Sequence, residues 1–499
     1  MDYPLRASGA RTAFAILLAL LVSACASVGE GQLSRKQYAQ LEAGLRSHIT
    51  TLASDEFEGR RPGTRGETLT LDYLRNEFTR IGFESGTNDP GHPWLAPVTL
   101  VTSKPRDQHV TMVVGRRKVE LPNDQMLFYS DSRLQRVEGA EIVFAGTSSS
   151  NLSEAEVKGR VVLLQWSEDD PAAERRLFDM GATALVNVVD DPRVLDLVRV
   201  RNERERYTLV GEEDGTIHAY ATEDAIEAGL GKSVWDGLRA AAEGANFGPQ
   251  VLKARINIET NSQVRELRTN NFIAKLPGRV PNSGAILLMG HWDHLGICRG
   301  EGEADRICNG AVDNASGIAV LIELSRRLAA TGPYDRDIYV LGTTSEELGL
   351  LGAKAFVESP SIPLDSIIAA FNFDTVAIAP NGVTVGYIGQ GQTSLDPVVI
   401  STLHRLKRKL APKELADRFS RRQDGWVLLN RDVPAITLSN MMADEGILNE
   451  FMNSTYHRPN DDARNLVLGG AIDDLLLHEV LVKRLASVKD YPGPGEQSH

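Results

Sequence analysis

The chain has 499 residues, of which 42% are hydrophobic and 24% charged, and its formal net charge is −13. This length favours two or three compact units over a single domain. The acidic balance argues against nucleic acid as a partner, because phosphate binding requires concentrated Lys and Arg.

The N-terminus has the pattern of an export signal. A basic start precedes an apolar run from Ala13 to Val22. At about ten residues this run is too short to span a bilayer, so a membrane anchor helix is the weaker alternative. The sequence Val-Ser-Ala-Cys at 22–25 resembles a bacterial lipoprotein cleavage box. We therefore expect a signal peptide over 1–24, lipidation of Cys25, a tether over 25–34, and an exported protein with a lipid anchor in the outer membrane, facing the periplasm.

The rest of the chain divides by its pattern of helices and strands. Helical periodicity predicts helices over 35–53 and 67–81. Short apolar strands (141–144, 160–164, 184–189) and helices near 172–180 and 233–242 predict a small separate α/β or β-rich unit over 121–257. From Asn271 on, strands (285–289, 337–343, 367–373, 383–388, 435–438) alternate with helices (316–329, 350–357, 397–410, 470–488). We expect 35–120 and 258–490 to form one α/β domain, a buried sheet covered by helices on both faces.

Five side chains with metal-binding chemistry follow one another through this last part, each in its own short motif. They are His291 in Gly-His-Trp-Asp-His, Asp313 in Gly-Ala-Val-Asp-Asn-Ala-Ser-Gly, Glu347 in Ser-Glu-Glu-Leu-Gly, Asp374 in Phe-Asn-Phe-Asp-Thr, and His457 in Tyr-His-Arg-Pro-Asn-Asp. Imidazoles and carboxylates without a thiolate suit zinc in a catalytic site. One such ion uses about three protein ligands, so five ligands predict two ions that share a bridging carboxylate. The pattern indicates a two-metal hydrolase.

Most of these residues lie just past a predicted strand. In open α/β sheets functional residues gather at the carboxyl ends of strands, which supports a single site. Each motif alone has an ordinary explanation: a structural His, a helix-capping Asp, a charged helix N-terminus or a surface His.

The residue types also suggest individual roles. Asp313 is expected to bridge, because a carboxylate has two oxygens. Of the adjacent pair, we expect Glu347 to bind metal and Glu346 to stay free as the general base. Asp293 is a candidate to orient the ring of His291.

Two further site residues are expected to play lesser parts. His294 should point away from the ligands, as pocket lining or as a second-layer contact. The Tyr456 hydroxyl is a candidate donor to the developing oxyanion.

Cys298 and Cys308 both lie between His291 and Asp313. An oxidising compartment allows a disulfide between them. Unpaired thiols, or thiols that bind metal, are the alternatives.

Together these motifs closely resemble metallopeptidase family 28, the co-catalytic dizinc aminopeptidases. The resemblance implies a three-layer α/β/α fold with a central mixed β-sheet and two Zn²⁺ per chain. It assigns His291 and Asp374 to one ion, Glu347 and His457 to the other, and Asp313 to both.

The resemblance extends to the insert and shows one departure. Residues 140–254 resemble the protease-associated (PA) domain that many members of the family carry. Many members also have Ser-Asp-His in a late loop, where this chain has Gln423-Asp424-Gly425. Substrate contacts in that loop are therefore open.

The expected activity is removal of N-terminal residues from peptide substrates, with Glu346 as the catalytic base and Asp293 orienting His291. A carboxypeptidase-type enzyme or another dizinc amidohydrolase is the nearest alternative. A single-zinc cyclase and a non-catalytic, receptor-like binding protein are further alternatives, which the complete set of five ligands disfavours.

Overall fold

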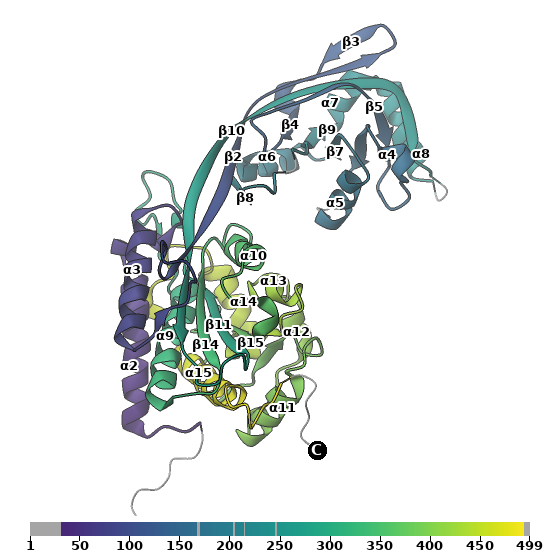
Figure 1. Cartoon of the computed structure of the whole chain (residues 1–499). Coiled ribbons are helices and arrows are strands. Elements are labelled where there is room, and N and C mark those ends of the chain that lie inside the picture. The colour runs from purple at the N-terminus through teal and green to yellow at the C-terminus, as the bar shows by residue number, and fades with distance from the viewer. Residues whose placement is uncertain (1–30, 167–169, 203–204, 214, 245–246, 494–499) are drawn as a thin grey trace, which may run out of the picture. The chain divides into compact units, whose positions relative to one another are not determined.

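The computed structural model describes residues 31–166, 170–202, 205–213, 215–244 and 247–493 (Figure 1). They form two compact units. The main unit combines Met1–Ala96 with Asn270–His499, and the inserted unit is Pro97–Thr269. The expected signal peptide, Cys25 and most of the tether lie outside the described residues.

The main unit contains the following elements. Its helices are α2 (Arg35–Leu52), α3 (Arg65–Arg80), α9 (Gly317–Thr331), α10 (Leu351–Glu358), α11 (Asp396–Arg405), α12 (Lys413–Asp417), α13 (Gly425–Leu429), α14 (Glu445–Ser454) and α15 (Leu468–Leu485). Its strands are β1 (Glu84–Ser85), the end of β10 (Gln250–Leu276), β11 (Ala285–His291), β12 (Gly296–Ile297), β13 (Ile307–Cys308), β14 (Asp337–Thr343), β15 (Ile367–Asn372), β16 (Gly386–Ile388) and β17 (Ala435–Ser439).

The sheet of the main unit is mixed. Its strand order is β16-β17-β15-β11-β14-β10, with β1 paired to β10. The four strands from β17 to β14 run parallel, while β16 and β10 pair antiparallel at either side. All seven residues of β11 are buried. This agrees with the apolar run that predicted a sheet covered on both faces.

Helices cover both faces of this sheet, because successive strand residues point to opposite sides. Ile286 and Leu288 of β11 pack in a core with α2, α3, α9 and α15. Leu287 and Met289 pack in a second core with α10 and α13. The main unit is therefore the expected three-layer α/β/α structure.

The inserted unit is a second α/β structure with cores of its own. Its strands are β2 (Leu95–Val114), β3 (Arg117–Glu120), β4 (Met126–Tyr129), β5 (Leu134–Phe144), β6 (Val161–Gln165), β7 (Ala184–Val189), β8 (Arg206–Leu209), β9 (His218–Thr222) and the first part of β10. Its helices are α4 (Glu154–Val157), α5 (Pro171–Asp179), α6 (Pro192–Asn202), α7 (Glu223–Leu230) and α8 (Lys232–Ala242). Strands β5, β6, β7 and β9 are parallel neighbours.

The inserted unit is larger than the expected 121–257. The chain enters it along β2, and residue 257 lies inside the continuous strand β10. Among the described helices, none is both long enough and apolar enough to cross a membrane.

Candidate metal centre

The parallel strands bring the predicted ligands to one edge of the sheet. His291 is the last residue of β11 and pairs in register with Thr343, the last residue of β14. Glu346 and Glu347 follow β14, and Asp374 follows β15, which pairs with β11 on its other side. Left-handed backbone at Ser345 (φ 57°) and Thr375 (φ 55°) makes a sharp turn beside each of these carboxylates. Strained turns of this kind often occur at functional sites.

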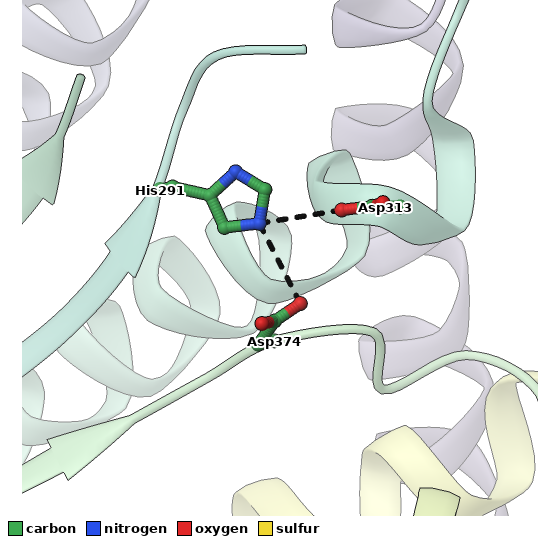
Figure 2. A group of neighbouring side chains, drawn as sticks. All are labelled: His291, Asp313 and Asp374. Atoms are coloured by element: carbon green, nitrogen blue, oxygen red, sulfur yellow. Dashed lines mark ion pairs between the residues drawn. The ribbon is translucent and has the colours of Figure 1, made fainter. Parts of the chain in front are cut away.

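A first group of ligand atoms surrounds the ring of His291 (Figure 2). Its Nε2 lies 3.3 Å from Oδ1 of Asp313 and 3.5 Å from Oδ1 of Asp374. The His291 and Asp313 side chains are 2% and 4% exposed, whereas Asp374 is 20% exposed. The cluster is therefore open to solvent on the Asp374 side.

A second group forms around the other oxygen of Asp313. Nε2 of His457 lies 3.3 Å from Oδ2 of Asp313 and 2.9 Å from Oε2 of Glu347. The two oxygens of Asp313 thus face two different imidazoles, which is the arrangement that a bridging carboxylate needs. Asp313 is not the cap of the following helix: α9 begins at Gly317, after Ser316.

His294 joins this second group, so the expectation that it points away was wrong. Its Nδ1 lies 2.5 Å from Oε1 of Glu347 and 3.9 Å from Oδ2 of Asp313. The extended backbone of β11 ends at His291, so side chains no longer alternate between faces at residue 294. Gly310 makes room for the ring, because a Cβ at that position would lie 2.6 Å from His294 ring carbons.

The donor atoms fit divalent cations. Two groups are compact enough for an ion: His291 with Asp313 and Asp374, and His294 with Asp313 and Glu347. Nε2 of His457 is buried and has no hydrogen-bond partner among the described residues, although two carboxylates lie within 4 Å. A buried imidazole nitrogen without a hydrogen bond, beside carboxylate oxygens, is suited to a metal ion.

Asn314 connects the loops that carry the ligands. Its Nδ2 donates to the carbonyl oxygens of His291 (3.3 Å) and Phe373 (2.9 Å). Its Oδ1 accepts from the backbone N–H groups of Gly317 (3.0 Å) and Thr375 (3.2 Å). The side chain following Asp313 therefore holds the loops of His291 and Asp374 in place.

Asp461 and Arg60 support the Asp313 segment from two other parts of the chain. Asp461 accepts hydrogen bonds from the N–H groups of Val312 (2.9 Å) and Asp313 (3.1 Å). The buried guanidinium of Arg60 donates to four backbone carbonyls, those of Leu52, Trp292, Asn309 and Gly310. Burial lowers the pKa of Arg60 to about 10. Neither residue was predicted to have a role, although Asp461 belongs to the His457 motif.

Asp293 contacts the ring of His291 differently than expected. His291 Nδ1 lies 3.1 Å from the backbone carbonyl of Asp293 and 3.9 Å from its carboxylate. The Asp293 carboxylate instead accepts from the N–H of Glu346 at 3.0 Å. Burial raises the pKa of Asp293 to about 8. Asp293 thus links the loops of His291 and Glu346.

Glu346 is separate from the ion-pair network of its neighbour Glu347. No ion pair or side-chain hydrogen bond joins its carboxylate to another described residue, and it lines the cavity beside the cluster. Burial raises the pKa of Glu346 well above its usual range, and the charges of Asp374 and Asp424 act in the same direction. A carboxyl group in this state holds a proton more readily than an exposed one.

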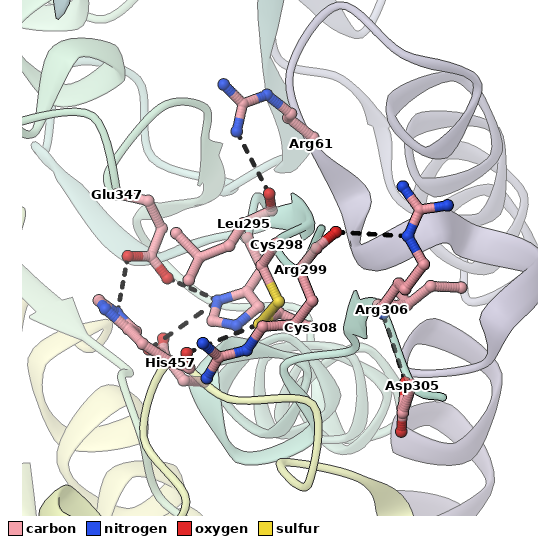
Figure 3. The surroundings of a disulfide bond; sticks show 12 residues. Arg61, Leu295, Cys298, Arg299, Asp305, Arg306, Cys308, Glu347 and His457 are labelled. Atoms are coloured by element: carbon pink, nitrogen blue, oxygen red, sulfur yellow. Dashed lines mark hydrogen bonds and ion pairs between the residues drawn. A yellow bond between two sulfur atoms is a disulfide. The ribbon is translucent and has the colours of Figure 1, made fainter. Parts of the chain in front are cut away.

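Cys298 and Cys308 form a disulfide beside His457 (Figure 3). It closes the hairpin of β12 and β13. The Cys308 sulfur lies 3.6 Å from the carbonyl oxygen of His457. The cross-link therefore packs against the backbone of a predicted ligand.

A pocket opens onto the cluster. Asp313, Glu346 and Asp374 line one part of it. The rest of its lining is Asn372, Thr375, Ile388, Phe419, Arg422, Gln423, Thr437, Met441, Leu448, Met452 and Tyr456. The ring of Tyr456 stacks on that of His457, with centroids 3.7 Å apart. The cavity therefore has an anionic end and an apolar wall.

Comparison with known proteins agrees with this site. The signature of peptidase family M28 matches residues 271–474, which contain all five predicted ligands. No curated protein matches the sequence. An aminopeptidase from Aneurinibacillus sp. strain AM-1 is 18% identical over 88% of this chain and 93% of its own, with a TM-score of 0.53. The zinc aminopeptidase BSAP from Bacillus subtilis is 15% identical over 91% of this chain and 97% of its own, with a TM-score of 0.46.

At this identity the likeness to the Aneurinibacillus enzyme shows a common fold, and the family is identified by the sequence signature. That signature covers the strands, turns and helices that bring the histidines and carboxylates together. Residues 271–474 therefore belong to peptidase family M28.

Proposed function

We propose that this chain is a dizinc aminopeptidase that removes N-terminal residues from peptides. One observation carries the proposal: the two oxygens of Asp313 face His291 on one side and His457 on the other. Asp374 completes the first ligand group and Glu347 the second. Zinc ions bound there would polarise the scissile carbonyl and lower the pKa of an attacking water.

Glu346 would move the proton in this reaction. Its carboxylate lines the cavity and is not engaged with the ligand groups, so it can accept a proton from the attacking water. The same oxygen can then return the proton to the leaving amine nitrogen. Asp293 fixes the loop of Glu346 through the backbone N–H, and acts as a positioning residue.

Two other cavity residues fit an N-terminal substrate. Asp374 is partly exposed at the cavity, so a zinc ion that it helps to hold would be accessible to a free α-amino group. Tyr456 lines the cavity on the His457 side, where its hydroxyl would donate to the oxyanion.

A comparison of leucyl-p-nitroanilide with its N-acetylated form tests the direction of cleavage. An aminopeptidase cleaves only the free-amine substrate, whereas a carboxypeptidase-type enzyme prefers N-blocked peptides with a free carboxylate. Cleavage of the blocked peptides alone would overturn the proposal.

Glu346→Gln tests the base. General-base catalysis contributes roughly 10²- to 10⁴-fold, so kcat should fall by that factor while zinc content stays at the wild-type value. Glu358→Gln is the control, because Glu358 pairs with Arg431 on the surface, with its side chain 54% exposed. Full activity in Glu346→Gln would exclude Glu346 as the base.

The N-terminus and the insert add two proposals. We propose that the chain is exported and lipid-anchored at Cys25, which mass spectrometry of the mature N-terminus would test. An unmodified Cys25 in envelope fractions would overturn that proposal.

The protease-associated assignment of the inserted unit rests on sequence resemblance, and deletion of this unit would show whether it restricts substrate access.

A further inference from the structure

The cavity lining contains one positively charged side chain, Arg422, that has no ion-pair partner among the described residues. Among the described residues that line it, Arg422 is the only Lys or Arg. No ion pair or side-chain hydrogen bond joins Arg422 to another described residue. By contrast, the nearby Arg418 pairs with Glu445 at 2.7 Å. Arg422 is thus available to bind an anion that enters the cavity.

Arg422 is exposed and lies at the cavity wall. Its guanidinium carbon lies 5.5 Å from the ring centroid of Phe419, which also lines the cavity, in a cation–π contact. The next residue, Gln423, is buried and accepts hydrogen bonds from the N–H of Gly425 (2.8 Å) and the hydroxyl of Thr437 (3.3 Å).

Asp424, which follows Gln423, is also buried and accepts a hydrogen bond from the hydroxyl of Thr343. Two consecutive side chains therefore anchor this loop in the interior, so the backbone that carries Arg422 is fixed.

The charges in the cavity indicate the kind of group that Arg422 would bind. Asp313, Glu346 and Asp374 line its other end, where the proposed zinc ions would offset the charge of the carboxylates. Away from that end, an anionic group of the substrate is attracted to the guanidinium, whose planar donors match a carboxylate in two parallel hydrogen bonds.

We propose that Arg422 forms a carboxylate subsite, so that the preferred substrates are peptides with a carboxylate near the scissile bond. This inference rests on the proposed peptidase function. The carboxylate has two possible sources, the α-carboxylate of a dipeptide or tripeptide and the side chain of an acidic residue.

Two pairs of substrates separate these sources. Leucyl-glycine and leucyl-glycinamide differ only in the α-carboxylate. Glutamyl- and glutaminyl-p-nitroanilide differ only in the side-chain carboxylate. The wild-type enzyme should prefer the charged member of at least one pair, and this preference should weaken as salt screens the interaction.

Arg422→Gln is the decisive variant. It should lower kcat/KM for the charged member of the preferred pair roughly three- to tenfold, and leave the neutral member unchanged. Arg422→Lys should give an intermediate value, because lysine keeps the charge without the paired donors. Arg421→Gln is the matched control, since this neighbouring arginine is exposed like Arg422 but does not line the cavity.

Three results would overturn the subsite: no preference for the charged member in either pair, equal loss for both members in Arg422→Gln, or the same loss in Arg421→Gln. If the wild-type enzyme cleaves none of the four substrates, the proposed function fails and the subsite fails with it.

Discussion

Asn314→Ala tests how the ligand loops are held together. The side chain of Asn314 is fully buried and makes four hydrogen bonds, to the backbone of His291, Phe373, Gly317 and Thr375. A buried hydrogen bond contributes about 1 kcal/mol net, so the free energy of unfolding should fall by about 4 kcal/mol. Zinc affinity should fall roughly 10- to 100-fold, because three of these bonds hold the loops that carry His291 and Asp374. Urea unfolding of the zinc-free protein and competition with a chelator measure the two effects.

Asn440→Ala is the matched control. Asn440 is also buried, and its side chain donates to the carbonyl of Gly470 (3.0 Å) and accepts from Arg408 (2.9 Å). This variant should lose about 2 kcal/mol of unfolding free energy and bind zinc like the wild type. If Asn314→Ala is no less stable than Asn440→Ala and keeps wild-type zinc affinity, Asn314 does not hold the site together.

Three other variants test the surroundings of the cluster. His294→Ala should weaken zinc binding roughly tenfold or more by releasing Oε1 of Glu347, whereas His294→Asn should retain much of the affinity because its amide can donate to the same oxygen. Chelator competition measures both, and equal loss in the two variants would show that His294 does not act as a hydrogen-bond donor. Replacing Cys298 and Cys308 with Ser should cost about 3 kcal/mol in unfolding free energy, and an unchanged thermal midpoint would contradict a structural disulfide. Arg60→Ala should cost roughly 3 kcal/mol or more, because four backbone carbonyls lose their donor; urea unfolding at the wild-type midpoint would contradict this.

The strands and the ligand cluster of the main unit were predictable where the residue pattern and the structure have the same physical cause. The continuous apolar run at 285–289 gave β11 because a strand buried on both faces needs apolar residues throughout. The clustering of His291, Glu347 and Asp374 followed from parallel strands ending at one edge. The long strand β10 was not predicted, because much of it is polar and half-exposed, so most of it lacks the continuous apolar run that predicted the buried strands.

Side-chain direction outside regular strands was not predictable. His294 points into the cluster because the chain leaves β11 at His291, a change that adjacent residue types do not reveal. Asp293 was expected near the His291 ring, but a backbone carbonyl takes that place. Asn314 and Asp461 satisfy backbone groups from distant segments, so their roles depend on tertiary contacts. In the sequence, these roles were indicated only by the position of Asn314 beside Asp313 and by the position of Asp461 in the His457 motif.

Zinc stoichiometry after exhaustive dialysis tests the central claim, that two cations share the carboxylate of Asp313. The wild-type protein should retain two zinc ions per chain, His291→Ala and His457→Ala should each retain one, and Asp313→Ala should lose affinity for both. A wild-type protein with a single ion, or an Asp313→Ala variant that keeps two, would contradict the shared site.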